Sequence, residues 1–539
     1  MKKFLSLLLA VVLLVGITAC GQAQTSTQAP AAPAASGNFN KTGYPITNEP
    51  TTITALIHGR INYATNYPQP RILWEEIEKL TNVHLDVVVL PDSEQLPLFM
   101  AAGDWPDFFH DNLQDIYITD YGILGKQLVD YNTILDLMPH LAASFEEFPD
   151  TRKAQTYSNG AIYQTVNYGD TITSANSRSH YRSDILAEFD LPVPKTTDEF
   201  FETCVKLLEY RGEPPFAPGW DKDYWYSLFG DGVYFGYSSN LNIGFDDEYN
   251  DGTVTFSRTT EQARHYMEYM NKLYTNGLIH PEFVMLEKED AALIGMAQDS
   301  KTVFINHAIA SVNLDAFPSG KFDIGVLAPL TSPYSDTQCI QTGVAPWGLS
   351  RGKAINAASK NIDIVARVLD IAYAKTEVAP GTGLYGTAFT WGPEGITWEF
   401  TNAEKTTHKQ NVPEGMTYTE FAYGFQVYDG HGLDLGLKYS IVMDGSNSEA
   451  RQIGYRDHNH PYARAWMFPP VKFLDDERST VDNYITELRT YANDMHDRFI
   501  MGVADIEKEW DTYVSTFDKM ELQEIMKIYQ AAYDRWRNL

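Results

Sequence analysis

Residues 51–89, TTITALIHGRINYATNYPQPRILWEEIEKLTNVHLDVVV, contain the pattern that decides the fold. Apolar residues alternate along 51–58 as in a strand, and Leu73, Ile77 and Leu80 have the spacing of a helix face. A second alternating stretch runs from Val83 to Val89. A strand, a helix and a strand in this order predict a right-handed parallel crossover and therefore an α/β fold.

The same pattern indicates where a ligand binds. In open α/β sheets, ligands lie beyond the carboxyl ends of the strands. The loop His58–Tyr63 directly follows the first predicted strand, so Arg60 and Tyr63 are expected on the ligand side. A plain surface loop would show the same pattern, and that alternative stays open.

Further elements alternate along the rest of the chain. Thr196 is a candidate cap for a helix whose first turn is acidic. The remaining expected helices are 266–274, 362–374, 481–499 and 522–536, and the short strands are 303–305 and 322–327. No repeat of about 20 to 50 residues, the period of solenoid and propeller folds, interrupts this order.

The first 48 residues have the composition of an export signal and a tether. Lys2 and Lys3 precede an apolar run that is too short to span a membrane, and small residues follow it. Residues 17–20, Ile-Thr-Ala-Cys, resemble the lipobox of bacterial lipoproteins, in which the cysteine is acylated. We expect a signal peptide over 1–19, lipidation at Cys20 and a flexible Ala/Pro/Ser/Thr tether over 20–48. A cleaved signal with a chance cysteine is the alternative.

The composition excludes some partners. The chain has 71 acidic and 41 basic residues, a net charge of −30, with no clustered basic surface of the kind nucleic acids need. An anionic main ligand is disfavoured for the same reason. Aromatic residues are 13% of the chain, including 33 Tyr and 10 Trp.

Cysteines and acidic clusters give little indication of a cofactor. Cys204 and Cys339 could pair, but two free buried thiols are favoured. The histidines of 457–460 do not have the arrangement of a metal site, and 246–252 lacks the ligand spacing of an EF-hand. We predict no metal and no cofactor, and expect 246–252 to form a hairpin turn.

Several stretches resemble the extracellular solute-binding proteins of ABC importers, family 1, in particular the large lipoprotein branch that serves oligosaccharide uptake. The likeness is carried by LFMAAGDWPDFF (98–109), NGAIY (159–163), YRSDILAEFDLPVPKTTDEF (181–200), LYTNGLIHPEF (273–283) and the tail 499–536. It departs from the family pattern at Ile185, where Trp is usual, and at Asn159, where Asp is usual.

The resemblance implies a two-lobed, type 2 periplasmic-binding-protein-like fold with a ligand cleft between the lobes and a helical C-terminal part. We expect one lobe from 49–165 plus about 300–350, and the other from 166–299 plus about 351–539. The protein would be a lipid-anchored monomer on the outer face of the bacterial membrane. It would bind an oligosaccharide and deliver it to the permease of an ABC importer.

The ligand-binding candidates combine aromatic platforms with polar side chains. Trp220, Tyr224 and Trp225 lie in an irregular polar segment, Trp347 lies near a predicted lobe crossing, and Trp391 lies in a Gly/Thr-rich loop. Arg182 and Asp184, like Arg60, are polar candidates. Each could instead pack in the core or pair locally, and Trp398 is expected to pack.

Two other function classes remain open. A secreted glycoside hydrolase needs only two suitably spaced carboxylates, which 71 acids cannot exclude, although the chain has no nucleophile elbow, zinc-protease motif or P-loop. A sugar sensor that does not serve transport would differ only in its partner. The family pattern favours a binding protein without catalytic activity.

Overall fold

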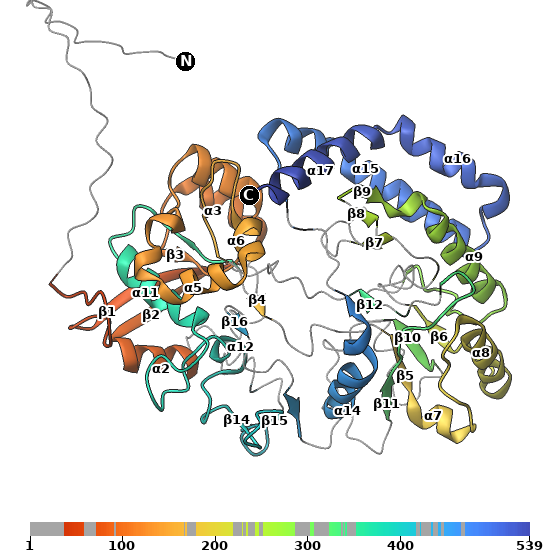
Figure 1. The fold of residues 1–539 in the computed structure, drawn as a ribbon, viewed down its shortest axis with the longest axis horizontal. Helices are drawn as coiled ribbons and strands as arrows, with labels where there is room; N and C mark the ends of the chain where they lie inside the picture. Colours follow the sequence, from red (N-terminus) through yellow and green to blue (C-terminus); the bar gives the residue numbers. More distant parts are fainter. Residues whose placement is uncertain are drawn as a thin grey trace, which may run out of the picture. The chain divides into compact units, whose positions relative to one another are not determined.

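The sheet that the opening motif predicts forms as expected in the computed structural model (Figure 1). Strands β1 (Thr51–Ile57) and β2 (Val83–Val89) pair in parallel from Thr51 and Val83 onward, and α2 (Ile72–Thr81) connects them. β3 (Phe108–Phe109) pairs in parallel with β1 on its other side, and β13 (Ala354–Ile355) completes the order β13-β3-β1-β2. The predicted parallel crossover is confirmed.

The structure describes residues 37–58, 72–90, 93–165, 168–169, 179–218, 229, 233–235, 243–246, 252–285, 302–306, 323–335, 338, 340–341, 352–416, 421, 433–434, 440–443, 447–464, 469 and 471–539. All statements below concern these residues. The part from Phe39 to Leu539 forms one compact unit. Within the described part, no helix is both long enough and apolar enough to cross a bilayer.

Both faces of this first sheet are covered. Ile53 and Ala55 of β1 belong to one buried cluster, and Leu56 belongs to another on the opposite face. We call the elements that build these two clusters, between residues 46 and 389, the first half. Its helices are α3 (Leu96–Ala102), α4 (Asp115–Tyr117), a π-helix (Ile118–Leu124), α5 (Pro139–Glu147), α6 (Pro149–Gln155), α11 (Ile362–Asp370) and α12 (Ala388–Trp391), with short 3₁₀ turns at 93–95, 131–133, 135–137 and 371–373.

A separate hydrophobic core defines what we call the second half, built from residues 185–330 and 471–533. Its sheet has the order β11-β5-β10-β6, formed by Ile324–Val326, Ser179–Arg182, Phe304–Asn306 and Phe216–Ala217. Helices α7 (Ser183–Glu188), α8 (Thr197–Arg211) and α9 (Glu261–Thr275), the 3₁₀ turn 257–259 and the C-terminal helices α15 (Asp475–Ile500), α16 (Ile506–Lys519) and α17 (Leu522–Arg537) complete it. Thr196 caps α8 as predicted, because its hydroxyl accepts the Glu199 N–H at 3.0 Å.

The grouping of segments differs from the predicted lobes. The sequence analysis placed 300–350 with the first lobe, yet β10 and β11 both pair antiparallel with β5 of the second half. It also placed everything after 351 in the second lobe, yet β13 pairs with β3, and residues 354–389 build the first core. A short strand carries no information about which sheet it joins, so these two assignments were wrong.

Short ladders connect segments that lie between the two halves along the chain. β4 (Tyr168–Gly169) pairs in parallel with β16 (Leu433–Asp434), and β12 (Ile340–Gln341) with β18 (Ala463–Arg464). Thr165 and Lys353 form an antiparallel bridge between two further segments of this kind. The other elements are the sheet β7-β8-β9 (Val233–Phe235, Ile243–Asp246, Val254–Phe256), the sheet β14-β15-β17 (Trp398–Phe400, Thr407–Gln410, Ile441–Val442), α14 (Asn447–Gly454), a π-helix (455–459) and a 3₁₀ turn (460–462). β8 pairs antiparallel with β9, as the hairpin expected around 246–252 requires, and residues 247–251 of its turn lie outside the described part.

The predicted tether extends too far. Residues 39–48 were included in it, but Ile46 and Thr47 are completely buried and Phe39 pairs with Thr47. The Arg367 guanidinium also donates to the Asn40 carbonyl at 2.7 Å. This segment therefore packs on the first half, because its few apolar side chains find a place in that core. Residues 1–36, with Cys20, lie outside the described part.

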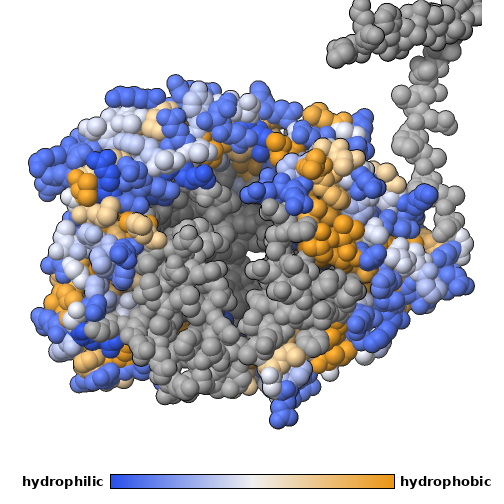
Figure 2. Space-filling model, turned by 180° about the vertical axis from the view of Figure 1, so that it is seen from behind, coloured by the Kyte–Doolittle hydropathy of each residue, from blue (hydrophilic) through white to orange (hydrophobic). Residues whose placement is uncertain are grey.

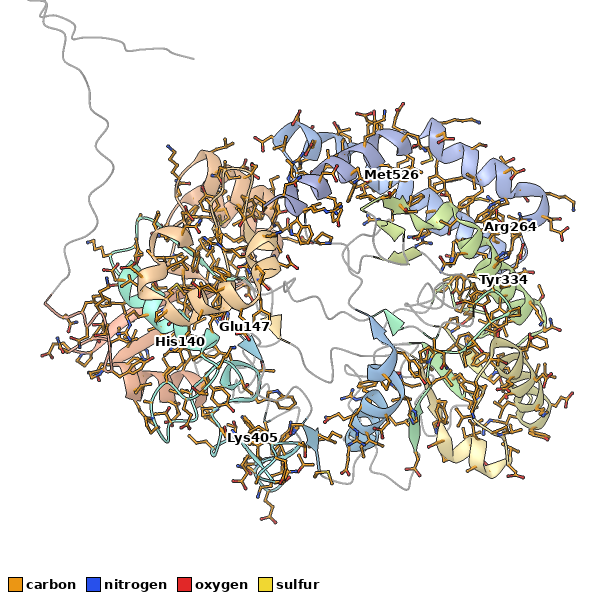
Figure 3. The ribbon with its side chains drawn as sticks, viewed as in Figure 1. His140, Glu147, Arg264, Tyr334, Lys405 and Met526 are labelled. Atoms are coloured by element: carbon orange, nitrogen blue, oxygen red, sulfur yellow. The ribbon has the colours of Figure 1, made fainter. Side chains whose placement is uncertain are left out.

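On the face that Figure 2 shows, the described residues are mostly hydrophilic, and hydrophobic residues gather in a few patches. Large apolar side chains remain exposed on neighbouring elements of the first half, namely Leu98, Ile116 and Leu124. Figure 3 shows labelled side chains from both halves, His140 and Glu147 on α5 of the first and Arg264 on α9 of the second.

Candidate functional site

The carboxyl ends of β1 and β3 bring polar residues together. His58 follows β1 and His110 follows β3, and the two strands run parallel as neighbours. The His58 backbone N–H donates to Oδ2 of Asp111 at 2.9 Å. His58, His110 and Asp111 are all less than a tenth exposed. This is the edge at which α/β sheets bind their ligands.

The His58 side chain is suited to bind a neutral polar group. Burial lowers its pKa below the ordinary 6.5, although the Asp111 carboxylate acts in the opposite direction. This shift favours the neutral imidazole, in which one nitrogen can donate a hydrogen bond and the other can accept one. Its Nε2 is buried and has no hydrogen-bond partner in the described part of the chain. Buried polar atoms rarely lack a hydrogen-bond partner, and each exception needs an explanation.

The turn after β3 is fixed to the segment that leaves the first half. The Gln164 side chain accepts the Leu113 N–H and donates to the Leu113 carbonyl, both at 3.1 Å. Next to it, Thr165 and Lys353 exchange two backbone hydrogen bonds of 3.1 and 2.9 Å. The Tyr131 hydroxyl donates to the Lys353 carbonyl at 2.8 Å. These hydrogen bonds hold in place the turn that carries the polar cluster of His58, His110 and Asp111.

Gly352 lies in a crowded part of the segment that makes these hydrogen bonds. A Cβ at this position would come 2.7 Å from the Thr165 carbonyl oxygen and 2.9 Å from side-chain oxygens of Asn112 and Gln164. We expect Gly352→Ala to lower the free energy of unfolding by about 1–3 kcal/mol, because the backbone oxygen it meets is itself held in the ladder. Urea unfolding of the purified protein measures this change.

A matched control is Gly37→Ala, since a Cβ there meets nothing within 4 Å. The expectation is wrong if both alanine variants unfold at the same urea concentration as the unchanged protein.

Arg182 and Asp184 are close together, as a pair. Nε and Nη2 of Arg182 donate to the two carboxylate oxygens of Asp184 at 2.8 and 2.6 Å. The arginine side chain is 6% exposed and the aspartate 29%. They lie at the end of β5 and the start of α7 in the second half. The pairing orients the guanidinium, and a role of either residue in binding stays a proposal.

Trp391 and Trp398 lie in one aromatic cluster, in different environments. Trp398 is completely buried in β14, and its Nε1–H donates to the Gly392 carbonyl at 2.9 Å, so its predicted packing role is confirmed. Trp391 ends α12 and is half-buried, with its ring edge-on to His408 at 5.4 Å. Nε1 of Trp391 has no hydrogen-bond partner within the described ranges. Trp391 remains a binding candidate on these grounds.

The other predicted site residues lie outside the described part of the chain. These are Cys20, Arg60, Tyr63, Trp220, Tyr224, Trp225 and Trp347, together with Cys339. Cys204 is a buried free thiol, and burial raises its pKa well above the usual value. Within the described residues, no three His, Cys, Asp or Glu side chains converge as metal ligands do.

Sequence reasoning did not identify His110, Asp111, Gln164 and Lys353 as parts of the site. A signal for the first two is present, because the apolar pair Phe108-Phe109 is followed at once by His-Asp-Asn. A polar run directly after a buried parallel strand marks the carboxyl edge in the same way as His58 does. Gln164 and Lys353 come from distant segments and give no such signal.

Comparison with known proteins begins with relatives in sequence. No family model matches the chain. It is 23% identical over 493 residues to the fructooligosaccharide ABC transporter substrate-binding protein FusA of Streptococcus pneumoniae, covering 87% of this chain and 88% of the relative. It is 23% identical to the lipoprotein LipO of Bacillus subtilis, covering 85% and 88%. A shorter match, 26% identical over 48% of this chain, is to the polygalacturonan/rhamnogalacturonan-binding protein YtcQ of the same species, of which it covers 51%.

Solved structures share the fold. A complex of the S. pneumoniae FusA with fructo-nystose superposes with a TM-score of 0.67 at 19% identity, covering 90% of this chain and 99% of that one. The HMO-binding, ABC-transporter-associated solute-binding protein of Bifidobacterium longum infantis gives 0.66 at 17%, with the same coverage. The resemblance stated from the motifs is therefore confirmed: the chain is a homologue of the substrate-binding proteins of ABC transporters and has the two-domain α/β fold of the solute-binding proteins.

Proposed function

We propose that the chain is the substrate-binding lipoprotein of a carbohydrate ABC importer. It would capture an oligosaccharide between its two halves and deliver it to a membrane permease. The observation that supports this proposal is the polar cluster at the carboxyl ends of β1 and β3. There the His58 backbone N–H is bonded to Asp111, and the buried Nε2 of His58 has no hydrogen-bond partner among the described residues.

The chemistry of this cluster suits a neutral sugar. Each sugar hydroxyl both donates and accepts, and a neutral imidazole beside a carboxylate offers both roles. The apolar faces of sugar rings need aromatic partners. For these we propose Trp391 and, in segments outside the described residues, Tyr63, Trp220, Tyr224, Trp225 and Trp347. Arg60, Arg182 and Asp184 are proposed as further polar contacts.

The named relatives support a carbohydrate ligand. Three of them are named for fructooligosaccharides, for polygalacturonan and rhamnogalacturonan, and for HMO. They are transport and binding proteins, so we propose that this chain has no catalytic activity of its own. The acidic composition favours a neutral oligosaccharide over an anionic one such as a galacturonan.

A thermal-shift screen that also detects hydrolysis tests the function. The purified protein is incubated with fructooligosaccharides such as kestose, with milk oligosaccharides and with pectic oligosaccharides. We expect one class to raise the melting temperature, since a ligand at a hundred times its Kd adds about 2.7 kcal/mol of stability. The sugar should be recovered intact by chromatography. Released product would instead identify a hydrolase, and no shift with any glycan would contradict the proposal.

A further inference from the structure

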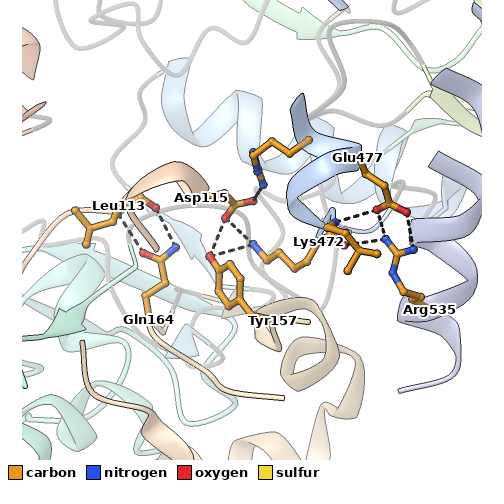
Figure 4. A network of polar contacts seen from close by, with 9 residues as sticks. Leu113, Asp115, Tyr157, Gln164, Lys472, Glu477 and Arg535 are labelled. Carbon is orange, nitrogen blue, oxygen red and sulfur yellow. Dashed lines mark hydrogen bonds and ion pairs between the residues drawn. The ribbon is translucent and has the colours of Figure 1, made fainter. Parts of the chain in front are cut away.

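Asp115 is the centre of a polar network (Figure 4). Its carboxylate accepts hydrogen bonds from the Tyr157 hydroxyl at 2.7 Å, from Lys472 Nζ at 2.9 Å and from the Arg478 guanidinium at 3.1 Å. The Lys472 ammonium also lies 4.5 Å from the centre of the Tyr157 ring. One carboxylate thus meets two cations and a phenol.

The network joins the two halves. Asp115 begins α4, close after β3, and Tyr157 belongs to a buried cluster of the first half. Lys472 follows Val471, which lies in the second core, and Arg478 lies on α15. A second contact between the halves is made by Lys153 of α6, which donates to the Arg537 backbone carbonyl at the end of α17, at 3.4 Å. The two halves have separate cores and meet here through charged groups.

Its burial distinguishes this network from an ordinary surface ion pair. Exposed pairs contribute little, because water and salt screen them. Here the side chains of Asp115, Lys472 and Arg478 are only 26%, 16% and 23% exposed. Burial by itself raises the pKa of Asp115, but the two cations and the Tyr157 hydroxyl outweigh it and hold the pKa at about 2. The carboxylate therefore stays ionised at all physiological pH values.

Each side of the network is anchored in its own half. The Gln164 side chain fixes the turn before Asp115 through its two hydrogen bonds to Leu113. On the other side, the Arg535 guanidinium donates to the Lys472 carbonyl at 3.4 Å and pairs with Glu477 at 2.8 Å. Because its residues are held in place on both sides, the network can restrict how the two halves move relative to each other.

In sequence, the network lies next to the segments that connect the two halves, which we call the crossing segments. Gln164 precedes Thr165, which bridges to Lys353, and Lys472 comes soon after β18, which pairs with β12. When two bodies rotate about crossing segments, groups near those segments move least. Contacts at such a place can persist while distant surfaces separate.

From these observations we propose that the network of Asp115, Tyr157, Lys472 and Arg478 is a pivot, which keeps the two halves in contact beside their crossing segments and limits their relative motion to one mode. The inference concerns the free protein and does not depend on which ligand it binds. A latch, which would hold only one arrangement, is the competing description.

Distance measurements on the free, full chain test the pivot. Spin labels carried on a non-natural amino acid at Ala143 of α5 and Glu209 of α8, both exposed, report the separation of the halves by double electron–electron resonance. Asp115→Asn keeps an oxygen for the Tyr157 hydroxyl and loses the charge. We expect this variant to widen the distance distribution, with a tail at separations that the unchanged protein does not populate. Lys472→Met should do the same, and the double variant should add nothing further.

Asp494→Asn is the matched control, because Asp494 pairs with Arg498 within α15 and spans no boundary. Circular dichroism and thermal unfolding establish that each variant is folded, and the two single variants alter opposite sides of the contact. Unchanged distributions in both single variants would overturn the pivot, as would equal widening by the control. A displaced but equally narrow distribution would identify a latch instead.

Discussion

Replacing Asp111 by Ala is expected to weaken oligosaccharide binding about tenfold to a hundredfold. A hydrogen bond to a charged group contributes about 1.5–3 kcal/mol, and 1.4 kcal/mol corresponds to a factor of ten in Kd. The change also removes the acceptor of the buried His58 N–H, which would free the first residue of the ligand loop. Isothermal titration calorimetry with the sugar found in the screen measures the loss.

Two further variants make this result interpretable. Asp111→Asn keeps an acceptor for the His58 N–H and removes only the charge, so it should fold normally and bind with intermediate affinity. Asp136→Ala is the control, because that carboxylate is 64% exposed in a surface pair with Lys41. Equal Kd values for all three variants and the unchanged protein would rule out the carboxyl edge of the first sheet as the binding site.

Replacing Cys20 by Ser is expected to move nearly all of the protein from the membrane fraction into the culture medium. Without the thiol there is no group to acylate, and each buried CH₂ of an acyl chain contributes about 0.8 kcal/mol to membrane binding. If the protein is the lipoprotein proposed above, losing the acyl chains removes its anchor. Fractionation of cells followed by immunoblotting measures the distribution.

Thr18→Ser is a suitable control, because it keeps a small residue and leaves the cysteine in place. If the Cys20→Ser protein stays with the membrane while the control behaves like the unchanged chain, the lipid anchor is refuted and another segment must hold the protein there.

The elements of the fold were predicted well where the pattern was long or periodic. β1, α2 and β2 lie within a residue of their expected bounds, and α9 contains the whole predicted stretch 266–274. α15 begins at Asp475, six residues before the predicted start at 481, because its first turns are polar and carry no apolar period. The prediction of which half β10, β11 and β13 belong to was wrong, because pairing between distant segments depends on the packing of the whole chain.

The candidate site was predicted only as a location. The rule for carboxyl ends drew attention to the loop that begins at His58, whose backbone N–H donates to Asp111. The same rule applied to β3 would have identified His110 and Asp111, but a strand of two residues is too short to recognise from its period. Arg182 and Asp184 were predicted as polar ligand contacts, with local pairing as the alternative, and they form one ion pair. That pairing depends on side-chain rotamers that the sequence does not specify.

Residues 354–389 come late in the sequence but belong to the first half, and this has a consequence for biosynthesis. A growing polypeptide that has emerged only to residue 165 has β1, β2 and β3 but lacks β13 and α11, which complete their sheet and core. Contacts between segments so far apart along the chain form slowly. The N-terminal portion therefore stays incompletely folded until more than two thirds of the protein has left the ribosome, a state in which it can still be threaded through a translocation channel.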